Sequence, residues 1–202
     1  MTTLYGWGPM FGVAGPSPFV LKCDTQLQML GVEFDRAIAD LQSVSKGKAP
    51  YVEDNGEIIQ DSSFIRRHFE SKLGHDLDAG LSVEQKAIAA AFERLLEDRL
   101  VPVLGCERWL VDANFEKGPA HFFDGVPEPM RKEIVAGVRK DFADAQRGQG
   151  MGRHSREERL ALAEHAIGAM SDFLGEKDFM FGDQPKALDA VKISIIHDIL
   201  IY

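Results

Sequence analysis

The chain has 202 residues and a mass of 22.4 kDa, which suits one large domain or two small ones. A net charge of −9 and a sequence pI of about 5.1 disfavour nucleic acid and anionic membrane surfaces as general partners. Two cysteines without metal-ligand spacing, and no apolar run near the ~20 residues of a membrane span, predict a cytoplasmic protein with no metal and no transmembrane span.

The first part of the chain is predicted to form a strand, a helix and a strand. Residues 1–20 lack the basic region and continuous apolar segment of a signal peptide. The first strand covers residues 3–7, and a loop rich in glycine and proline follows it. Ser17-Pro18 is a favoured helix start, and Gly31 is a natural helix end. Residues 32–38 are predicted as the second strand, before a polar connection.

Residues 46–69, KGKAPYVEDNGEIIQDSSFIRRHF, form the most informative stretch of the sequence. Two short β runs flank Asn55-Gly56, the strongest hairpin-turn signal. Asp61-Ser62-Ser63 then opens a helix, with an apolar face predicted at Phe64, Ile65, His68 and Phe69. A free helix N-terminus binds carboxylates well, and Ala49 before Pro50 offers its backbone to an extended ligand if exposed. The alternative is an ordinary hairpin followed by a capped helix.

The chain after a linker at residues 75–81 is predicted to be helical. Ser82 to Gln85 matches a capping box, and an apolar stripe follows at Ile88, Phe92, Leu95, Leu96 and Leu100. Pro102 lacks an N–H group, so we expect it to kink or locally end this helix. Residues 117–125 are predicted as a loop, before a helix that begins at Pro127 or Pro129 and runs to about Arg147.

The last hundred residues contain two further predicted helices. Ser155 to Glu158 is a second capping box, after a break at residues 148–152, and its helix should run to about Leu174. A final apolar helix starts near Ala187 and reads as a buried core helix. It reaches Tyr202 without a cap or polar tail, so we expect further residues or a neighbour to cover that end.

The order strand, helix, strand, hairpin and helix is thioredoxin-like, and with an all-helical second half it resembles the glutathione S-transferases. SPFVLK at residues 17–22 and the stretch at 46–69 are similar to that superfamily's glutathione site. Residues 148–158 and 179–190 resemble the branch of metaxins and failed-axon-connections proteins. The resemblance implies an α+β two-domain fold, with a thioredoxin-like domain at residues 1–76 and an all-helical domain at 82–202.

The resemblance places Ser17 where serine-type members carry the hydroxyl that activates the glutathione thiol. A donated O–H and a helix N-terminus both stabilise a thiolate, whose parent thiol has a pKa near ~8.5. The alternative is that Ser17 only caps its helix. Tyr5 lies near the catalytic position of tyrosine-type members, and the sequence SPF makes Ser17 the better candidate. The long loop before Ser17 departs from the family pattern.

The same resemblance implies a binding role for five further residues. Ala49, ahead of an expected cis Pro50, would pair its backbone with the cysteinyl part of glutathione. Asp61 would meet the γ-glutamyl ammonium, and Ser62 its carboxylate. Lys48 would meet the glycyl carboxylate, or else be a solvated surface lysine.

By resemblance, the chain is expected to be a homodimeric detoxification enzyme that conjugates glutathione to an apolar electrophile. The alternative is a non-catalytic, metaxin-like binding or scaffold protein on the same fold, since a fold does not determine function. A thiol–disulfide role is weaker, because Ser17 stands where that chemistry needs a cysteine.

Other patterns are interpreted as structural. Asp189 should cap or bond inside the core, although Lys186 replaces the Ser or Thr usual at the start of that capping box. Arg153 and His154 could reach a ligand cleft and meet an acidic substrate. The glycines at residues 148–152 lack the strand and lysine of a phosphate-binding loop. Four aromatic residues are assigned to packing rather than to a substrate pocket, namely Trp109, His121, Phe122 and Phe123.

Overall fold

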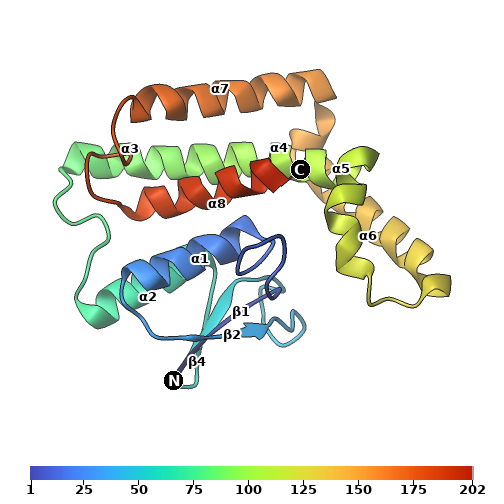
Figure 1. The fold of residues 1–202 in the computed structure, drawn as a ribbon, viewed down its shortest axis with the longest axis horizontal. Helices are drawn as coiled ribbons and strands as arrows, with labels where there is room; N and C mark the ends of the chain where they lie inside the picture. The colour runs from blue at the N-terminus through green and yellow to red at the C-terminus, as the bar shows by residue number, and fades with distance from the viewer. Residues whose placement is uncertain (202) are drawn as a thin grey trace. The chain divides into compact units, whose positions relative to one another are not determined.

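The computed structural model describes residues 1–201, and these divide into two compact units. The first unit contains residues 1–90 and 176–198, and the second contains residues 91–175 with the last turn of the chain. Figure 1 shows the course of the chain through both. Tyr202 lies outside the described residues, so the expectation about a covered end is not addressed there.

A four-stranded sheet organises the first unit. Its strands are β1 (Thr2–Gly6), β2 (Asp35–Ile38), β3 (Tyr51–Asp54) and β4 (Glu57–Gln60), in the order β2-β1-β3-β4. β1 and β2 are parallel, and the other two pairs are antiparallel. The predicted strand and hairpin order is confirmed. β2 begins at Asp35 rather than at the predicted residue 32, and the residues ahead of it pack against the core as irregular chain.

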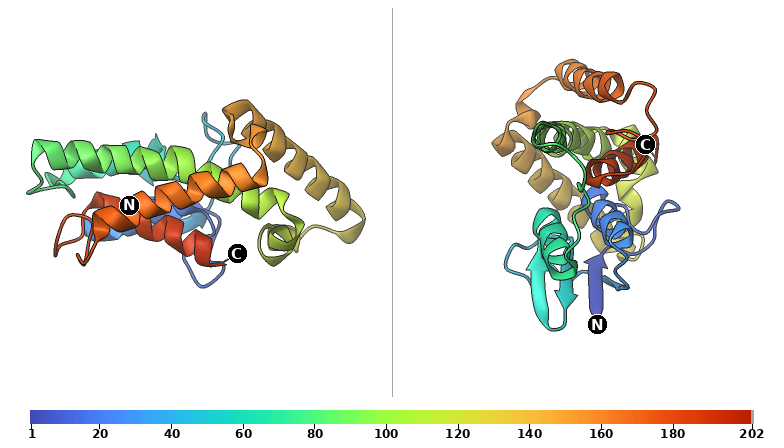
Figure 2. Two further views of the ribbon diagram at one scale, coloured as in Figure 1. Left: turned by 90° about the horizontal axis from the view of Figure 1, so that it is seen from above. Right: turned by 90° about the vertical axis from the view of Figure 1, so that its left-hand side faces the viewer.

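Two helices cover one face of this sheet, α1 (Pro18–Met29) and α2 (Ser62–Leu73), as Figures 1 and 2 show. Alternate strand residues point toward them, because side chains of a strand alternate between its two faces. The resulting core holds the fully or nearly fully buried residues Leu4, Cys23, Leu27, Leu30, Val52, Ile59, Ile65 and Phe69. The predicted apolar face of α2 is wrong at Phe64, which is 52% exposed, because only Ile65 and Phe69 project toward the sheet.

Gly6 lets α1 approach β1 closely. A Cβ atom added there would lie 2.6 Å from Cγ1 of Val20, which is itself buried in α1. Any larger residue would push the helix away from the strand or strain the valine. The spacing between α1 and the sheet therefore depends on this glycine.

The segment after α2, predicted as a linker, is held by ion pairs and hydrogen bonds. Arg66 on α2 donates to Asp78 at 2.6 Å, and the carboxylate of Asp78 also accepts from the backbone N–H of Ala187. Ala187 begins α8 (Ala187–Ile201), the last helix of the chain. Burial would lower the pKa of Arg66, but its bonds to Asp78 and Glu70 outweigh burial and raise it. This segment thus joins α2 to the start of α8. The predicted domain boundary between residues 76 and 82 stays a prediction.

Asp189 is a buried structural residue, as the sequence indicated. Its carboxylate accepts from the backbone N–H groups of Met180 and Lys186, both at 3.0 Å, and from Nζ of Lys192 at 2.9 Å. The bond from Lys186 is one half of a capping box, in which the third helical residue accepts from the backbone N–H of the residue before the helix. Asp189 therefore performs the capping that a Ser or Thr at position 186 would otherwise share.

A long helical run begins with α3 (Val83–Arg94), whose capping box forms as predicted between Ser82 and Gln85. It continues as a π-helical segment, η1 (Leu95–Leu100), and then as α4 (Val101–Leu110). The α-helix is interrupted just ahead of Pro102, as predicted. The interruption is a π-helical widening of the backbone, in which Val101 bonds to the carbonyl five residues back. No helix among the described residues is long and apolar enough to cross a membrane.

Shorter elements complete the second unit. They are α5 (Asp112–Lys117), a 3₁₀ turn at Pro119–Phe123 within the predicted loop, α6 (Glu128–Gln149), a 3₁₀ turn at Met151–Arg153 and α7 (Arg156–Leu174). The second capping box is confirmed, with both Ser155–Glu158 bonds present. Trp109 packs between Phe142 and Phe122, with ring centres 5.5 and 5.9 Å away. These aromatic rings pack on one another, which agrees with the structural interpretation of that cluster.

Candidate functional site

Three strand ends meet at one edge of the sheet in the first unit. Tyr51 at the start of β3 pairs with Tyr5 near the end of β1 and with Gln60 at the end of β4. The chain leaving β1 leads to α1, and the chain leaving β4 leads directly into α2. All six predicted site residues therefore belong to segments that enter or leave the sheet at this edge.

The peptide bond between Ala49 and Pro50 is cis, as expected. The carbonyl of Pro50 accepts from the backbone N–H of Asp61 at 3.4 Å, which connects this turn to the start of α2. The backbone N–H and C=O of Ala49 find no partner among residues 1–201. Ala49 is half-buried, so these two groups are available to an extended ligand.

Ser17 occupies the N-cap position of α1, with Pro18 in the first turn. Its backbone carbonyl accepts from Leu21 at 2.9 Å, as an N-cap carbonyl should. Its hydroxyl makes no capping bond and has no other partner within the described part of the chain. The residue is half-buried. The side-chain capping bond, which was the alternative explanation for this serine, is therefore not formed.

Asp61 and Ser62 stand at the N-terminus of α2. Asp61 is the N-cap, and its Oδ1 accepts from the N–H of Ser63 at 3.0 Å. Its backbone has φ +86°, an uncommon value for a residue with a side chain, which indicates that the turn geometry is imposed by its surroundings. Ser62 is only 5% exposed as a residue, and its hydroxyl finds no partner in residues 1–201. The hydroxyl oxygen is not one of the fully buried side-chain atoms that lack a partner, so it is open to solvent or to a polar ligand.

Lys48 lies beside this helix start. Its Nζ is 3.8 Å from Oδ2 of Asp61, and its side chain is 64% exposed. Such an exposed pair contributes little to stability. The lysine is free to move toward an anion that approaches the helix N-terminus.

Tyr5 is occupied by other interactions. Its ring stacks on that of Tyr51, with centres 4.5 Å apart, and its hydroxyl donates to Glu53 at 3.2 Å. Burial raises the pKa of Tyr5 above its usual value, and the hydrogen bond to the carboxylate of Glu53 raises it further. A tyrosine whose proton is held this way is a poor activator of a thiol, which favours Ser17 instead.

Sequence reasoning missed a hydrogen-bond network that fixes the loop before Pro50. The side chain of Gln60 accepts from the backbone N–H of Lys46 at 2.8 Å and donates to the hydroxyl of Ser45 at 3.0 Å. Nζ of Lys46 donates to the carbonyl of Gln60 and lies 4.6 Å from the centre of the Phe64 ring. No local pattern marks these residues, because their pairing depends on the strand register.

Two other candidates from the sequence lie elsewhere. Arg153 donates to the carbonyl of Arg147 at 3.0 Å, and His154 lines a pocket within the second unit. No cluster of three or more His, Cys, Asp or Glu side chains in the described residues is arranged to hold a metal ion.

Comparisons with known proteins identify the family. The profile of the glutathione S-transferase N-terminal domain matches residues 18–114, and that of the glutathione S-transferase C-terminal domain matches residues 163–202. The chain is 36% identical to the isoprene-epoxide–glutathione S-transferase of Rhodococcus sp. (strain AD45), over 98% of this chain and 87% of that protein. The chain therefore belongs to the glutathione S-transferase superfamily.

The branch within the superfamily is also defined. Failed axon connections of Drosophila melanogaster is 28% identical over 89% of this chain, and Metaxin-1 of Bos taurus is 29% identical over 70%. The chain spans about half the length of these two relatives, 46% and 47% respectively. The predicted relationship to the metaxin and failed-axon-connections branch is confirmed.

Solved structures confirm the fold. A glutathione S-transferase of Ceriporiopsis subvermispora in complex with glutathione matches 99% of this chain and 85% of its own, with a TM-score of 0.67 and 16% identity. A family member from Pseudomonas fluorescens with two glutathione molecules bound has a TM-score of 0.61 over 98% of this chain and 77% of its own, at 15% identity. The thioredoxin-like sheet followed by helices is thus the glutathione S-transferase fold.

Proposed function

We propose that this chain binds glutathione at the edge of the sheet and transfers its thiolate to an electrophilic small molecule. The observation that carries the proposal is the set of polar groups without partners at that edge. They are the Ser17 hydroxyl, the Ser62 hydroxyl and the backbone of Ala49. Each is open to a ligand, and each stands at a position that the family resemblance assigns to glutathione.

Charge and geometry at the start of α2 support the binding of the γ-glutamyl end. The helix N-terminus has free N–H groups and a positive dipole end, which stabilise a carboxylate. Ser62 would donate its hydroxyl to that carboxylate, and Oδ2 of Asp61 would accept from the ammonium. Lys48 would exchange its exposed pair with Asp61 for the glycyl carboxylate of the same ligand. One zwitterionic tripeptide would thereby occupy all three.

The extended backbone of the ligand would pair with Ala49. An N–H and a C=O from one residue match the C=O and N–H of a cysteinyl unit, as in the addition of one strand to a sheet edge. This places the cysteinyl sulfur on the side of α1, where Ser17 begins the helix.

The Ser17 hydroxyl would donate to the sulfur and stabilise the thiolate. Because the thiolate is the nucleophile, a lower thiol pKa raises the reactive fraction at neutral pH. Attack on an electrophilic carbon forms a C–S bond. With an epoxide, the C–O bond of the ring breaks, and the resulting alkoxide takes a proton from water.

An epoxide is the electrophile to test first. The Rhodococcus relative is named for isoprene epoxide, and its similarity extends over nearly the whole of this chain. We extend the proposal to a small apolar epoxide for that reason. The detoxification role, the cytoplasmic location, the homodimer and the division into domains at 1–76 and 82–202 belong to the same proposal.

The test combines binding and turnover. Calorimetric titration with S-methylglutathione measures binding without thiol chemistry, for the parent and for an Asp61→Ala, Ser62→Ala variant. We expect saturable binding to the parent, and binding at least ~10-fold weaker in the variant, since each lost hydrogen bond to a charged group is worth ~1.5–3 kcal/mol. Ser17→Ala should bind normally and lose about 10²-fold in the rate of conjugation to a small epoxide.

A second candidate function is a non-catalytic binding or scaffold protein. The similarity to Metaxin-1 and Failed axon connections favours it. A folded parent that shows no binding of S-methylglutathione would favour this second function over the transferase. Binding without any Ser17-dependent conjugation would leave a glutathione-binding protein without transferase activity.

A further inference from the structure

The sheet of the first unit has two edge strands, β2 and β4, and they differ in how far they are covered. At β4, the carbonyl of Gln60 accepts from Nζ of Lys46 at 3.1 Å, and a lysine at an edge discourages pairing with another chain. The backbone of residues 35–38 in β2 has no hydrogen bond beyond its pairing with β1 in the part of the chain that the structure describes. One side of β2 is therefore open to a further strand.

The sequence of β2 does little to protect this open side. Natural proteins blunt an edge with lysine, proline or a bulge, and β2 has no lysine or proline and pairs with β1 without a bulge. Ile38 at its end is 67% exposed. Its remaining protections are its short length and the acid Asp35, and an acid does not repel a basic partner.

The two faces of β2 differ in chemistry. Arg36 pairs in register with Leu4, which is buried under the helices. Arg36 and Ile38 therefore share the helix-covered face of the sheet, because side chains alternate along a strand. Asp35 points to the other face, where it is exposed and its carboxylate has no partner within the described chain. An added strand would thus meet an apolar side chain on one face and an acid on the other.

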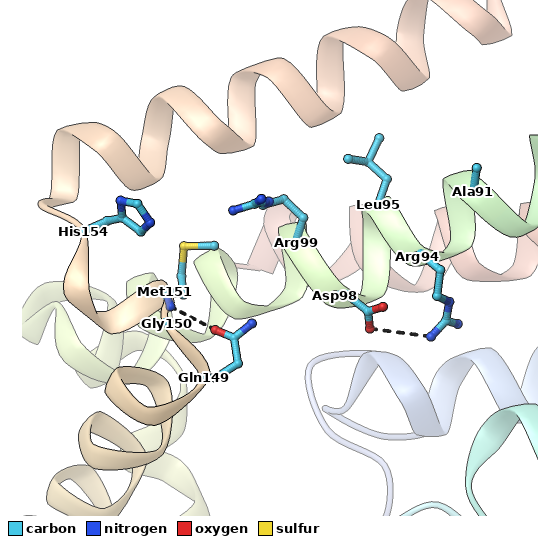
Figure 3. Close-up of a pocket in the computed structure, with 9 residues that line it drawn as sticks. All are labelled: Ala91, Arg94, Leu95, Asp98, Arg99, Gln149, Gly150, Met151 and His154. Atoms are coloured by element: carbon cyan, nitrogen blue, oxygen red, sulfur yellow. Dashed lines mark hydrogen bonds and ion pairs between the residues drawn. The ribbon is translucent and has the colours of Figure 1, made fainter.

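A pocket of about 500 Å³ lies beside β2 on the helix-covered face, apart from the pocket at His154 that Figure 3 draws. Its lining consists of Arg36 and the loop that follows β1, namely Pro9, Met10, Gly12, Val13 and Ala14. Two backbone hydrogen bonds of 3.1 and 3.2 Å between Met10 and Val13 close this loop on itself. A folded loop thus holds a largely apolar pocket next to the open edge, with room for a large apolar side chain.

The charge along this edge is acidic and is not compensated by neighbouring residues. Glu33 and Asp35 are exposed and have no ion pair within residues 1–201. Arg36 is neutralised by Asp24 of α1, whose Oδ1 lies 2.9 Å from its guanidinium. Like charges opposite one another destabilise a strand pair, and opposite charges stabilise it. A second copy of this chain would bring its own acids to the edge, whereas a basic segment complements them.

We propose that β2 accepts an extended basic segment of a partner protein as an added strand. Backbone pairing along β2 would supply the affinity, and alternate side chains would supply the specificity. Apolar side chains of the segment would contact Ile38 and enter the pocket, and lysine or arginine between them would meet Asp35 on the other face. The segment would therefore alternate apolar and basic residues. This assignment does not depend on glutathione binding.

The test uses two N-acetylated, C-amidated peptides of the same composition, KVKFKVK and KKKFVVK. Only the first alternates apolar and basic residues throughout, so the pair separates strand addition from general attraction to an acidic chain. Calorimetric titration of the full chain should show saturable binding of KVKFKVK and at least ~10-fold weaker binding of KKKFVVK. Amide hydrogen exchange measured by NMR should slow within residues 35–38 when KVKFKVK binds.

Asp35→Lys should weaken the binding of KVKFKVK by at least ~5-fold, because an attractive cross-strand pair becomes repulsive. Glu57→Lys is the matched control, since Glu57 is an exposed acid on the other edge strand and has no ion pair in the described residues. It should leave the binding of both peptides unchanged.

Four outcomes would each overturn the proposal. They are no binding of KVKFKVK by the folded parent, equal binding of the two peptides, equal losses in the two variants, and binding without slower exchange within residues 35–38. The last outcome would mean that the peptide lies elsewhere on the chain.

Discussion

The two ends of the β3–β4 hairpin each have an aspartate, and the two aspartates differ in how fully they are bonded. Asp54 ends β3 at the turn, is 5% exposed, and accepts from Thr2, His68 and Lys72 at 2.6–3.0 Å. Asp61 follows β4 at the open end, where its carboxylate has one backbone donor and a distant lysine.

This contrast distinguishes a structural acid from a candidate ligand-binding one. At the turn end, every strong acceptor position of Asp54 is used by side chains of the sheet and α2. At the open end, two serine hydroxyls and a stretch of backbone are left without partners. The groups at the open end are therefore open to a ligand, whereas the carboxylate of Asp54 is not.

The largest expected loss of stability comes from substitution of Asp54, at the turn end of the hairpin. Asp54→Ala removes the acceptor of four side chains, those of Thr2, Asn55, His68 and Lys72. It should lower the free energy of unfolding by about 3 kcal/mol, because hydrogen bonds to charged groups contribute ~1.5–3 kcal/mol each and Lys72 is partly solvated. Urea denaturation measures this. S-methylglutathione affinity should be unchanged in the folded protein. A loss below ~1 kcal/mol would show that the cluster is not structural.

The pH dependence of stability follows from the same residue. Burial would raise the pKa of Asp54, but the bonds from His68, Lys72 and Thr2 outweigh burial and hold it at about 2. The folded pKa lies below the usual ~3.9, so its stabilisation of about 2 kcal/mol is complete above pH ~4 and is lost as pH falls toward 2. Urea midpoints between pH 5 and 2 should show this decline, and Asp54→Asn should flatten it.

The next largest loss of stability is expected from a change in the packing of α1 against β1. Gly6→Ala places a methyl group 2.6 Å from Val20 and should cost ~1–3 kcal/mol by overpacking. Because α1 carries Ser17 at its start, the rate of conjugation should fall as well. Gly137→Ala in α6 is the control, since a Cβ there meets nothing within 4 Å and a helical alanine should stabilise slightly. Equal stability of both variants would contradict the close approach of α1.

Asp61→Ala should give the reverse of the result for Asp54. Loss of its N-cap bond to Ser63 should cost only about 1 kcal/mol of stability. Binding of S-methylglutathione should nevertheless weaken at least ~10-fold, because the ammonium loses its acceptor. When the two variants are measured side by side, Asp54→Ala should lose mainly stability and Asp61→Ala mainly binding. Similar losses of stability and of binding in both variants would contradict the distinction.

The smallest expected effect on stability is at Ser17. Ser17→Ala should change the free energy of unfolding by less than ~0.5 kcal/mol, because the hydroxyl makes no capping bond. Ser155→Ala, which breaks both halves of a true capping box, should cost about 1 kcal/mol under the same conditions. A loss at Ser17 as large as that at Ser155 would restore the capping explanation.

The order of the elements and the local signals within them could be predicted from the amino-acid sequence. Asn55-Gly56 predicted the hairpin because few residues adopt positive φ, and Ser82 and Ser155 predicted two helix starts because their side chains bond backbone groups only three residues away. These are short-range effects, so the neighbouring residues suffice to specify them. The superfamily was also recognisable, because its motifs lie in continuous stretches of sequence.

Which polar groups are paired depends on contacts between residues far apart in the chain. The partners of Asp54 come from β1 and α2, and those of Gln60 come from the loop before Pro50, so no local pattern marks them. The response to Pro102 was also set at this level, because the widened helix is one of several ways to accommodate a missing N–H. Whether Ser17 caps its helix or presents a free hydroxyl likewise depends on the position of its side chain in the folded chain.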